Sequence, residues 1–232
     1  MNQAVKFTSQ PADETYPSDA DQLAPVRAAP DSPKSLRTRA RILDAATRLF
    51  VEIGYHAATN ARIAEAAGLT RGAMLYHFPD RDSLVAAVAP HIQAARANLL
   101  QAAADAAPAG ADVIDHAIDS YWRLLSEPAF VAFAELEGAA RTDPALRARL
   151  APAEAAFDRA DLGEQLFDFV QGAEGPRFQA SRDLARFMLE GLARARLTYD
   201  EAGRTERLLA VVKRAAHLLN RKTSDQDLWT ES

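Results

Sequence analysis

The stretch that decides the fold is TNARIAEAAG, Thr59 to Gly68, followed directly by LTRGAMLYHF, Leu69 to Phe78. Thr59 or Asn60 can cap a short helix, because their side-chain oxygens can accept from the first free backbone N–H groups. Gly68 ends that helix, since glycine tolerates the positive φ of a tight turn. Thr70 can cap a second helix that reaches about Phe78. Two short helices joined by a three- to four-residue turn are typical of a helix-turn-helix.

The second short helix divides its side chains between an inner and an outer face. Met74 and Phe78 lie four residues apart and are expected to point into a small core. Arg71 and Leu75 share one neighbouring face, and Gly72 lies with Tyr76 on another, so these residues are available to a DNA groove and its phosphates. A buried pair of short helices in an ordinary bundle could use the same apolar pattern.

Apolar periodicity extends the helical prediction over most of the chain. Apolar residues recur at steps of three and four from Ser35 to the stop at Gly54. Further helices are expected at 81–107, 111–126, 128–141, 144–171, 179–201 and 205–221. With no strand pattern, the sequence predicts an all-α fold with four regions: a disordered tail at 1–33, a helix-turn-helix domain at 34–81, a helical effector-binding and dimerisation domain at 82–222, and a flexible tail at 223–232.

Charge is distributed unevenly along the chain. The net charge is −5, yet residues 34–81 carry eight basic and four acidic side chains, which leaves −9 for the remainder. A basic segment beside an acidic body fits DNA contact by one part of the chain. No apolar run approaches the roughly 20 residues of a membrane span, and the first thirty residues lack the apolar stretch of a secretory signal, so we expect a cytoplasmic protein without a membrane partner.

The side chains needed for catalysis are missing or scattered. The absence of cysteine excludes disulfides, thiolate zinc sites and thiol nucleophiles. The five histidines fall on separate segments, and no phosphate-binding glycine loop or serine elbow is present. We therefore expect no enzyme activity, no catalytic residue, no cofactor and no metal.

Several short strings around the helix-turn-helix match a known family. They are Ala45-Ala46 with Leu49-Phe50, Gly54-Tyr55, Thr59, Ile63-Ala64, the run from Ala67 to Met74, His77-Phe78 and Leu84. Over roughly Thr38 to Val88 the chain resembles the tetracycline-repressor (TetR) type of bacterial regulators. The resemblance implies a dimeric, ligand-responsive transcriptional regulator that binds a double-stranded DNA operator.

The resemblance also implies roles for individual residues. Thr70, Arg71, Gly72 and Ala73 would lie at the base edges, with Arg71 reading guanine. The remaining DNA-binding candidates are Tyr76 and His77, which would hold phosphates, and Arg37, Arg39, Thr59, Arg62, Leu75 and Arg81. Two positions depart from the family, because Leu75 stands where an aromatic residue is common and Arg81 where lysine is frequent. Leu75 either touches a thymine methyl group or faces inward.

The middle helices carry aromatic residues that could line an effector pocket. Ordinary core packing is the alternative for each of them. The candidates for binding an unknown small-molecule effector are Trp122, Phe130, Phe133, Arg141 and Phe167.

The last two predicted helices have broad apolar faces, which suits packing between subunits. A hairpin packed on its own bundle is the alternative. The dimer-interface candidates are Leu184, Phe187, Met188, Gly191, Leu192, Leu208, Val212, Ala215 and Leu219.

Together with these features, the resemblance implies a homodimeric repressor of a palindromic operator that a small effector releases. Two alternatives remain: an activator or constitutive DNA binder of the same fold, and an all-α ligand-binding or interaction protein without DNA binding.

Overall fold

The computed structural model describes residues 32–159, 176–199 and 201–220, and every regular element in these ranges is an α-helix. This confirms the predicted all-α fold. None of the described helices combines the length and apolarity needed to cross a bilayer. The predictions for the N-terminal tail before residue 32, for the helix end with Phe167 and for the C-terminal tail lie outside the described residues.

Three helices form the N-terminal part, and a side-chain cap starts each of them. Ser32, Thr59 and Thr70 each accept a bond from the backbone N–H three residues ahead, which satisfies a donor that the first helical turn leaves free. Fully buried Phe50, Met74 and Phe78 belong to the core that these helices share. The helices are α1 (Pro33–Ile53), α2 (Asn60–Ala66) and α3 (Arg71–His77).

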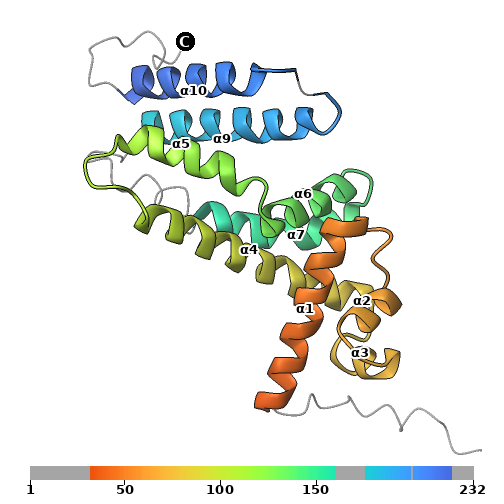
Figure 1. The fold of residues 1–232 in the computed structure, drawn as a ribbon. Coiled ribbons are helices and arrows are strands. Elements are labelled where there is room, and N and C mark those ends of the chain that lie inside the picture. Colours follow the sequence, from red (N-terminus) through yellow and green to blue (C-terminus); the bar gives the residue numbers. More distant parts are fainter. Residues whose placement is uncertain (1–31, 160–175, 200, 221–232) are drawn as a thin grey trace, which may run out of the picture.

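Four further helices form the body of the molecule (Figure 1). The first begins with a capping box, in which Asp80 accepts from the backbone N–H of Ser83 and the Ser83 hydroxyl lies 3.3 Å from the backbone nitrogen of Asp80. The helices are α4 (Arg81–Asp105), α5 (Val113–Leu124), α6 (Pro128–Ala140) and α7 (Pro144–Arg159).

The N-terminal part and the body share one apolar core. Ile42 and Phe50 of α1 pack in the same buried cluster as Ile92 of α4 and Leu136 of α6. At the edge of this junction Nε2 of His91 on α4 lies 2.9 Å from a carboxylate oxygen of Asp44 on α1. Packing is therefore continuous across the predicted boundary at residue 81, and side-chain contacts join α4 to α1.

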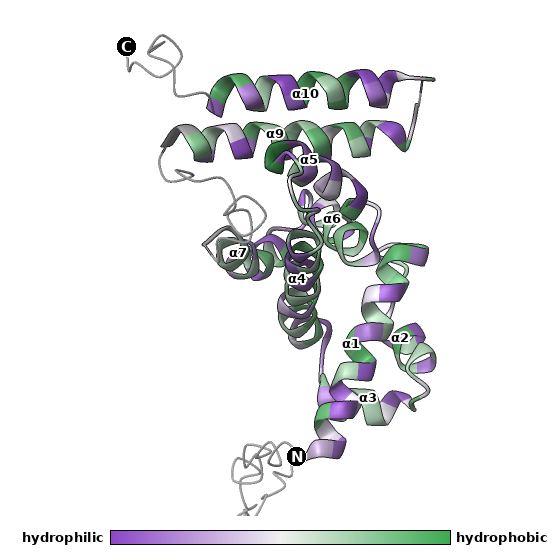
Figure 2. Ribbon diagram, turned by 60° about the vertical axis from the view of Figure 1, so that its left-hand side comes forward, coloured by the Kyte–Doolittle hydropathy of each residue, from purple (hydrophilic) through white to green (hydrophobic). Residues whose placement is uncertain are grey.

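The C-terminal helices α9 (Pro176–Arg196) and α10 (Arg204–Asn220) lie side by side at the end of the molecule away from α3 (Figures 1 and 2). A second buried cluster joins them to α5 and includes Ile118, Leu189 and Val212. Both helices begin and end within a few residues of the predicted bounds, except that α9 stops at Arg196, five residues before the predicted end.

Candidate nucleic-acid interface

The turn between α2 and α3 depends on one glycine and one arginine. Gly68 has φ of +64°, a conformation that side chains with a Cβ rarely adopt. A guanidinium nitrogen of Arg41 on α1 donates to the carbonyl of Ala67 just before it. The arginine satisfies a carbonyl at the end of α2 and holds the turn against α1, which sets the direction in which α3 leaves.

Helix α3 presents a clear inner and outer side. Met74 and Phe78 are at most 1% exposed, as predicted. Arg71 and Gly72 are exposed, and the ring of Tyr76 is 65% exposed. A Cβ built on Gly72 would meet no atom within 4 Å, so this backbone faces open space. The outer side of α3 therefore offers a cation, an aromatic hydroxyl and an unobstructed stretch of backbone to a partner.

The remaining α3 candidates lie at the margin of this surface. Ala73, Leu75 and His77 are half-buried, so the two interpretations of Leu75 both remain. The hydroxyl of Thr70 is occupied as an acceptor for the N–H of Ala73 at 3.1 Å. Thr59 plays the same capping part for α2, where it accepts from the N–H of Arg62.

The basic candidates on α1 and α2 have structural partners. Arg39 on α1 donates to the carbonyl of His77 at 3.2 Å, and its guanidinium lies 4.6 Å from the centre of the Phe78 ring. Arg37 bonds to a carbonyl of its own helix, and Arg62 bonds to the carbonyl of Ala57. Arg71 differs from these three because it makes no contact of this kind within the described residues.

Arg81 takes a position that the sequence did not reveal. Nη1 donates to the carbonyl of Ala58 at 2.7 Å, and Nη2 donates to the carbonyl of Tyr55 at 2.8 Å. The guanidinium also lies over the rings of Tyr55 and Phe50, at 4.4 and 5.4 Å from their centres. These contacts attach the start of α4 to the loop between α1 and α2. The family resemblance had instead placed Arg81 among the DNA contacts.

Residues 42–88, which span this helix-turn-helix and the start of α4, match the family model described as bacterial regulatory proteins of the tetR family. This segment of the chain belongs to the tetR family. Two curated relatives are the HTH-type transcriptional repressor Rv1474c of Mycobacterium tuberculosis, 49% identical over 51 residues, and the HTH-type transcriptional regulator Mb3439c of Mycobacterium bovis, 35% identical over 130 residues. The first alignment covers 22% of this chain and 27% of the relative, and the second covers 50% and 66%.

Solved TetR-family structures share the fold over most of the chain. A putative regulator from Rhodococcus sp. has a TM-score of 0.58 at 23% identity and covers 79% of this chain and 98% of its own. A putative regulator from Mesorhizobium loti has a TM-score of 0.60 at 14% identity, with 81% and 97% covered. A structure of the multidrug binding protein EbrR complexed with imidazole has a TM-score of 0.54 at 24% identity, with 76% and 93% covered. These structures show that the helical body of this chain has the same fold, although the sequence identity is low.

Three of the four effector candidates in the described body lie close together. Phe130 and Phe133 pack around the buried guanidinium of Arg96, and Arg141 lines an adjoining hollow that also has Phe133 in its wall. Trp122 lines another hollow on α5, near the end of α4, and Arg196 covers its ring.

Sequence reasoning missed Arg96. The signal was available, since this arginine continues the four-residue spacing of Val88 and Ile92 along the buried side of α4.

The dimer candidates split into two groups. Leu184, Phe187 and Met188 expose 46%, 63% and 39% of their surfaces, and Gly191 is exposed as well. Leu192 and Val212 are instead buried within the protomer. The others, Leu208, Ala215 and Leu219, are half-buried. Val211 and Leu218 on α10 are exposed apolar residues outside the candidate set.

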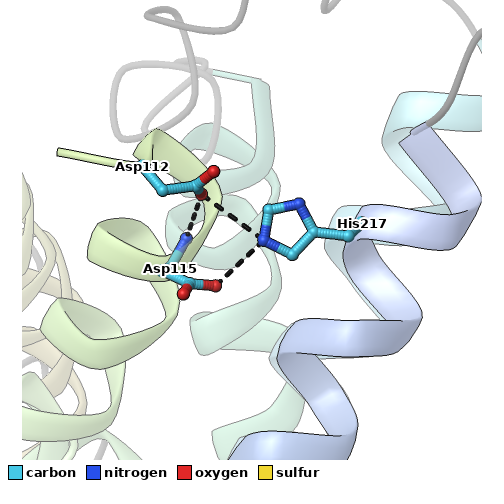
Figure 3. Close-up of side chains that lie close together, drawn as sticks. All are labelled: Asp112, Asp115 and His217. Atoms are coloured by element: carbon cyan, nitrogen blue, oxygen red, sulfur yellow. Dashed lines mark hydrogen bonds and ion pairs between the residues drawn. The ribbon is translucent and has the colours of Figure 1, made fainter. Parts of the chain in front are cut away.

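One cluster has side chains that could hold a metal. Asp112 and Asp115 at the start of α5 converge on His217 of α10, with Nε2 of His217 at 3.5 and 3.0 Å from their carboxylate oxygens (Figure 3). Asp112 also caps α5 by accepting from the backbone N–H of Asp115 at 3.0 Å. These contacts of His217 with the two carboxylates tie α5 to α10.

Proposed function

We propose that this protein is a homodimeric transcriptional repressor that binds a palindromic DNA operator through α3 and is released by a small molecule. The observation that carries this proposal is the outer side of α3, where Arg71, Gly72 and Tyr76 are exposed while Met74 and Phe78 anchor the helix. A relative with 49% identity over 51 residues is a transcriptional repressor, which favours repression over activation.

Arg71 is the residue proposed to read sequence. Its guanidinium has no competing partner among the described residues, so it can make a bidentate contact to the O6 and N7 atoms of guanine. Tyr76 is proposed to donate its hydroxyl to a phosphate, which fixes the position of α3 along the groove without reading sequence. Arg39 and Arg62 add positive charge near the phosphates while they hold their structural bonds.

The C-terminal helices supply the surface proposed for dimerisation. Leu184, Phe187 and Met188 of α9 and Val211 and Leu218 of α10 are exposed apolar side chains on neighbouring helices. A second copy would cover them as a four-helix packing, and two-fold symmetry would place two α3 helices on the two halves of a palindrome.

Release by an effector is proposed to use the shared core. Ligand binding in the body would favour one arrangement of α4, and the core that α4 shares with α1 would carry that change to α3. The affinity of the dimer for its operator would then fall by the ratio of the ligand's affinities for the two arrangements. The structural neighbour EbrR is described as a multidrug binding protein, which supports a small-molecule site in a body of this fold.

The test is binding of purified protein to the DNA flanking its own gene, compared with random DNA at several salt concentrations. Wild type is expected to prefer one palindromic segment, and Arg71→Ala is expected to lose about 1 to 3 kcal/mol of that preference. Arg123→Ala is the charge-matched control, because Arg123 is exposed on α5 and bonds only within its own helix. If wild type enriches no sequence from a random library either, the protein does not read DNA and the proposal fails.

A further inference from the structure

The body contains a cation that is almost fully removed from water. The guanidinium of Arg96 on α4 belongs to a residue only 4% exposed. The ring centres of Phe130, Phe133 and Phe157, from α6 and α7, lie 4.7, 4.8 and 4.1 Å from its central carbon. Arginine is rarely buried without a partner that compensates its charge, so this position calls for a functional explanation.

Arg96 has few partners for five N–H groups. Nη1 donates to the side-chain oxygen of Gln93 at 2.8 Å, and the nearest carboxylate oxygen, on Glu154, is 3.9 Å away. Nε is buried and finds no acceptor in the described part of the chain. Burial accordingly lowers the pKa of Arg96, although an arginine side chain remains charged at neutral pH.

The nearby carboxylates are already engaged with another arginine. Glu154 accepts from Arg186 on α9 at 2.9 Å and from Gln93 at 2.9 Å. Glu190 accepts from Arg186 at 3.0 Å and from the hydroxyl of Tyr121 at 2.6 Å. Two carboxylates thus divide their lone pairs among several donors, and neither of them accepts a hydrogen bond from Arg96.

There is space next to this group for a small ligand. A hollow of about 250 Å³ between α6 and α7 has Phe133 and Glu154 in its wall, and both of these residues are neighbours of Arg96. Its other charged walls are Glu137, whose pKa is raised by burial and by the Glu154 carboxylate, and the two arginines Arg141 and Arg147. Phe133 and Leu150 in the wall suit an apolar group, and Arg141 and Arg147 suit an acid.

We propose that this group and the adjoining hollow are the effector site and that it recognises a small apolar carboxylate, whose oxygens accept from Arg96 in place of Glu154 while its apolar part lies in the hollow beside Phe133 and Leu150. This inference rests on the proposed function and names the class of its ligand. A carboxylate can pair with two N–H groups of one guanidinium and would supply the acceptor that Nε lacks. An organic cation would meet aromatic faces already occupied by Arg96 and would be repelled by its charge.

The site has a direct connection to the DNA-binding part. Arg96 and Gln93 belong to α4, whereas Glu154 lies on α7 and Arg186 on α9. A ligand carboxylate that replaces Glu154 as the nearest anion to Arg96 changes the attachment of α4 to α7. Because α4 shares a core with α1, this change reaches the helix-turn-helix.

The experiment compares ligands that differ only in charge. Octanoate, octanamide and octylamine form one matched set, benzoate, benzamide and benzylamine form another, and carboxylates of four to twelve carbons extend the first. Binding is measured by calorimetry and by thermal shift with the full chain. At least one carboxylate is expected to bind ten times more tightly than its amide, and Arg96→Met is expected to remove this preference. Arg123→Met is the control, since Arg123 is exposed on α5.

A second measurement needs no substitution at the site. In the wild-type protein the Nε–Hε resonance of Arg96 is expected to move downfield and exchange more slowly when the carboxylate supplies an acceptor. Should Arg96→Met fail to fold, Arg96→Lys replaces it. This variant is expected to keep the preference for carboxylates but to bind them more weakly, because lysine retains the positive charge and lacks the planar pair of N–H donors.

Three outcomes would overturn the proposal: no carboxylate binds, the amine or amide binds as well as the acid, or the Arg96 resonance does not move. Operator binding measured without any ligand separates this result from the proposed function. If the protein binds its operator normally but binds no carboxylate, only the proposed class of ligand is rejected. Arg96-dependent carboxylate binding without operator binding rejects the regulatory function and leaves the ligand site.

Discussion

The guanidinium of Arg81 lies 4.4 Å from the centre of the Tyr55 ring and at the same time donates to the Tyr55 backbone carbonyl at 2.8 Å. Arg81 is the first residue of α4, and Tyr55 follows the glycine that ends α1. This single contact therefore joins the helix that crosses the body to the loop that leads into α2. It adds to the shared core and to the Arg41 hydrogen bond in holding α2 and α3 in a defined orientation.

We predict that the main effect of Arg81→Lys is to lower the stability of the free protein, and not its affinity for DNA. Lysine cannot donate to the carbonyls of both Ala58 and Tyr55 with the geometry of a planar fork, so one charged hydrogen bond is lost. The expected cost is about 2 kcal/mol, or a fall in melting temperature on the order of 5 °C. Calorimetry of the free protein measures it. An unchanged melting temperature together with weaker DNA binding would instead show that Arg81 acts on phosphate.

Gly72→Ala is expected to separate folding from DNA binding. A Cβ at Gly72 meets nothing within 4 Å, so the helix should gain roughly 0.5–1 kcal/mol from the reduced freedom of the unfolded chain. The added methyl group would obstruct close approach of α3 to base edges and should cost operator affinity about 1 kcal/mol or more. Gly138→Ala on α6, where a Cβ is equally unhindered, is the matched control and should leave operator binding unchanged.

Asp80 should make stability depend on pH at the acidic end. Its hydrogen bonds with Ser83 lower the pKa of the Asp80 carboxyl below its ordinary value of 3.8. A depressed pKa in the folded state means that the ionised cap contributes stability above about pH 4, and that this contribution is lost as pH falls through the folded value.

Asp80→Asn provides the measurement, because asparagine also caps helices but does not titrate. The wild type should withstand more denaturant than the variant at pH 7, and the difference should shrink as the pH falls below 4 through the lowered pKa of Asp80. A difference of constant size over this acidic range would assign the effect to cap geometry and not to charge.

The exposed surface of α9 predicts the oligomeric state. Phe187 is 63% exposed in the protomer, so Phe187→Glu should leave the fold intact. In a dimer it would bury an unpaired charge and should raise the dissociation constant about 30-fold or more, equivalent to roughly 2 kcal/mol. Sedimentation over a concentration series measures this change. Leu36→Glu, at an exposed position on α1, is the control, and equal behaviour of the two variants would contradict an interface at α9.

The local signals in the sequence predicted most helix bounds. Thr59, Gly68 and Thr70 act within four residues of their own positions, and caps and turns depend on backbone groups that are neighbours in sequence. The inward direction of Met74 and Phe78 followed from helical spacing for the same reason. Predictions that depended on a partner distant in sequence were less accurate. Leu192 of α9 and Val212 of α10 lie on the apolar faces predicted for the dimer interface, but their own protomer buries them.

The sequence by itself determined the all-α fold, the helix-turn-helix and the family, because periodicity, capping and short motifs are properties of adjacent residues. Only the tertiary structure decided the partners of long charged side chains. An arginine reaches several ångströms from its backbone, so its environment depends on which helices meet around it. Thus Arg71 is exposed to solvent, Arg81 is held by the carbonyls of Tyr55 and Ala58, and Arg96 is enclosed by three phenylalanine rings.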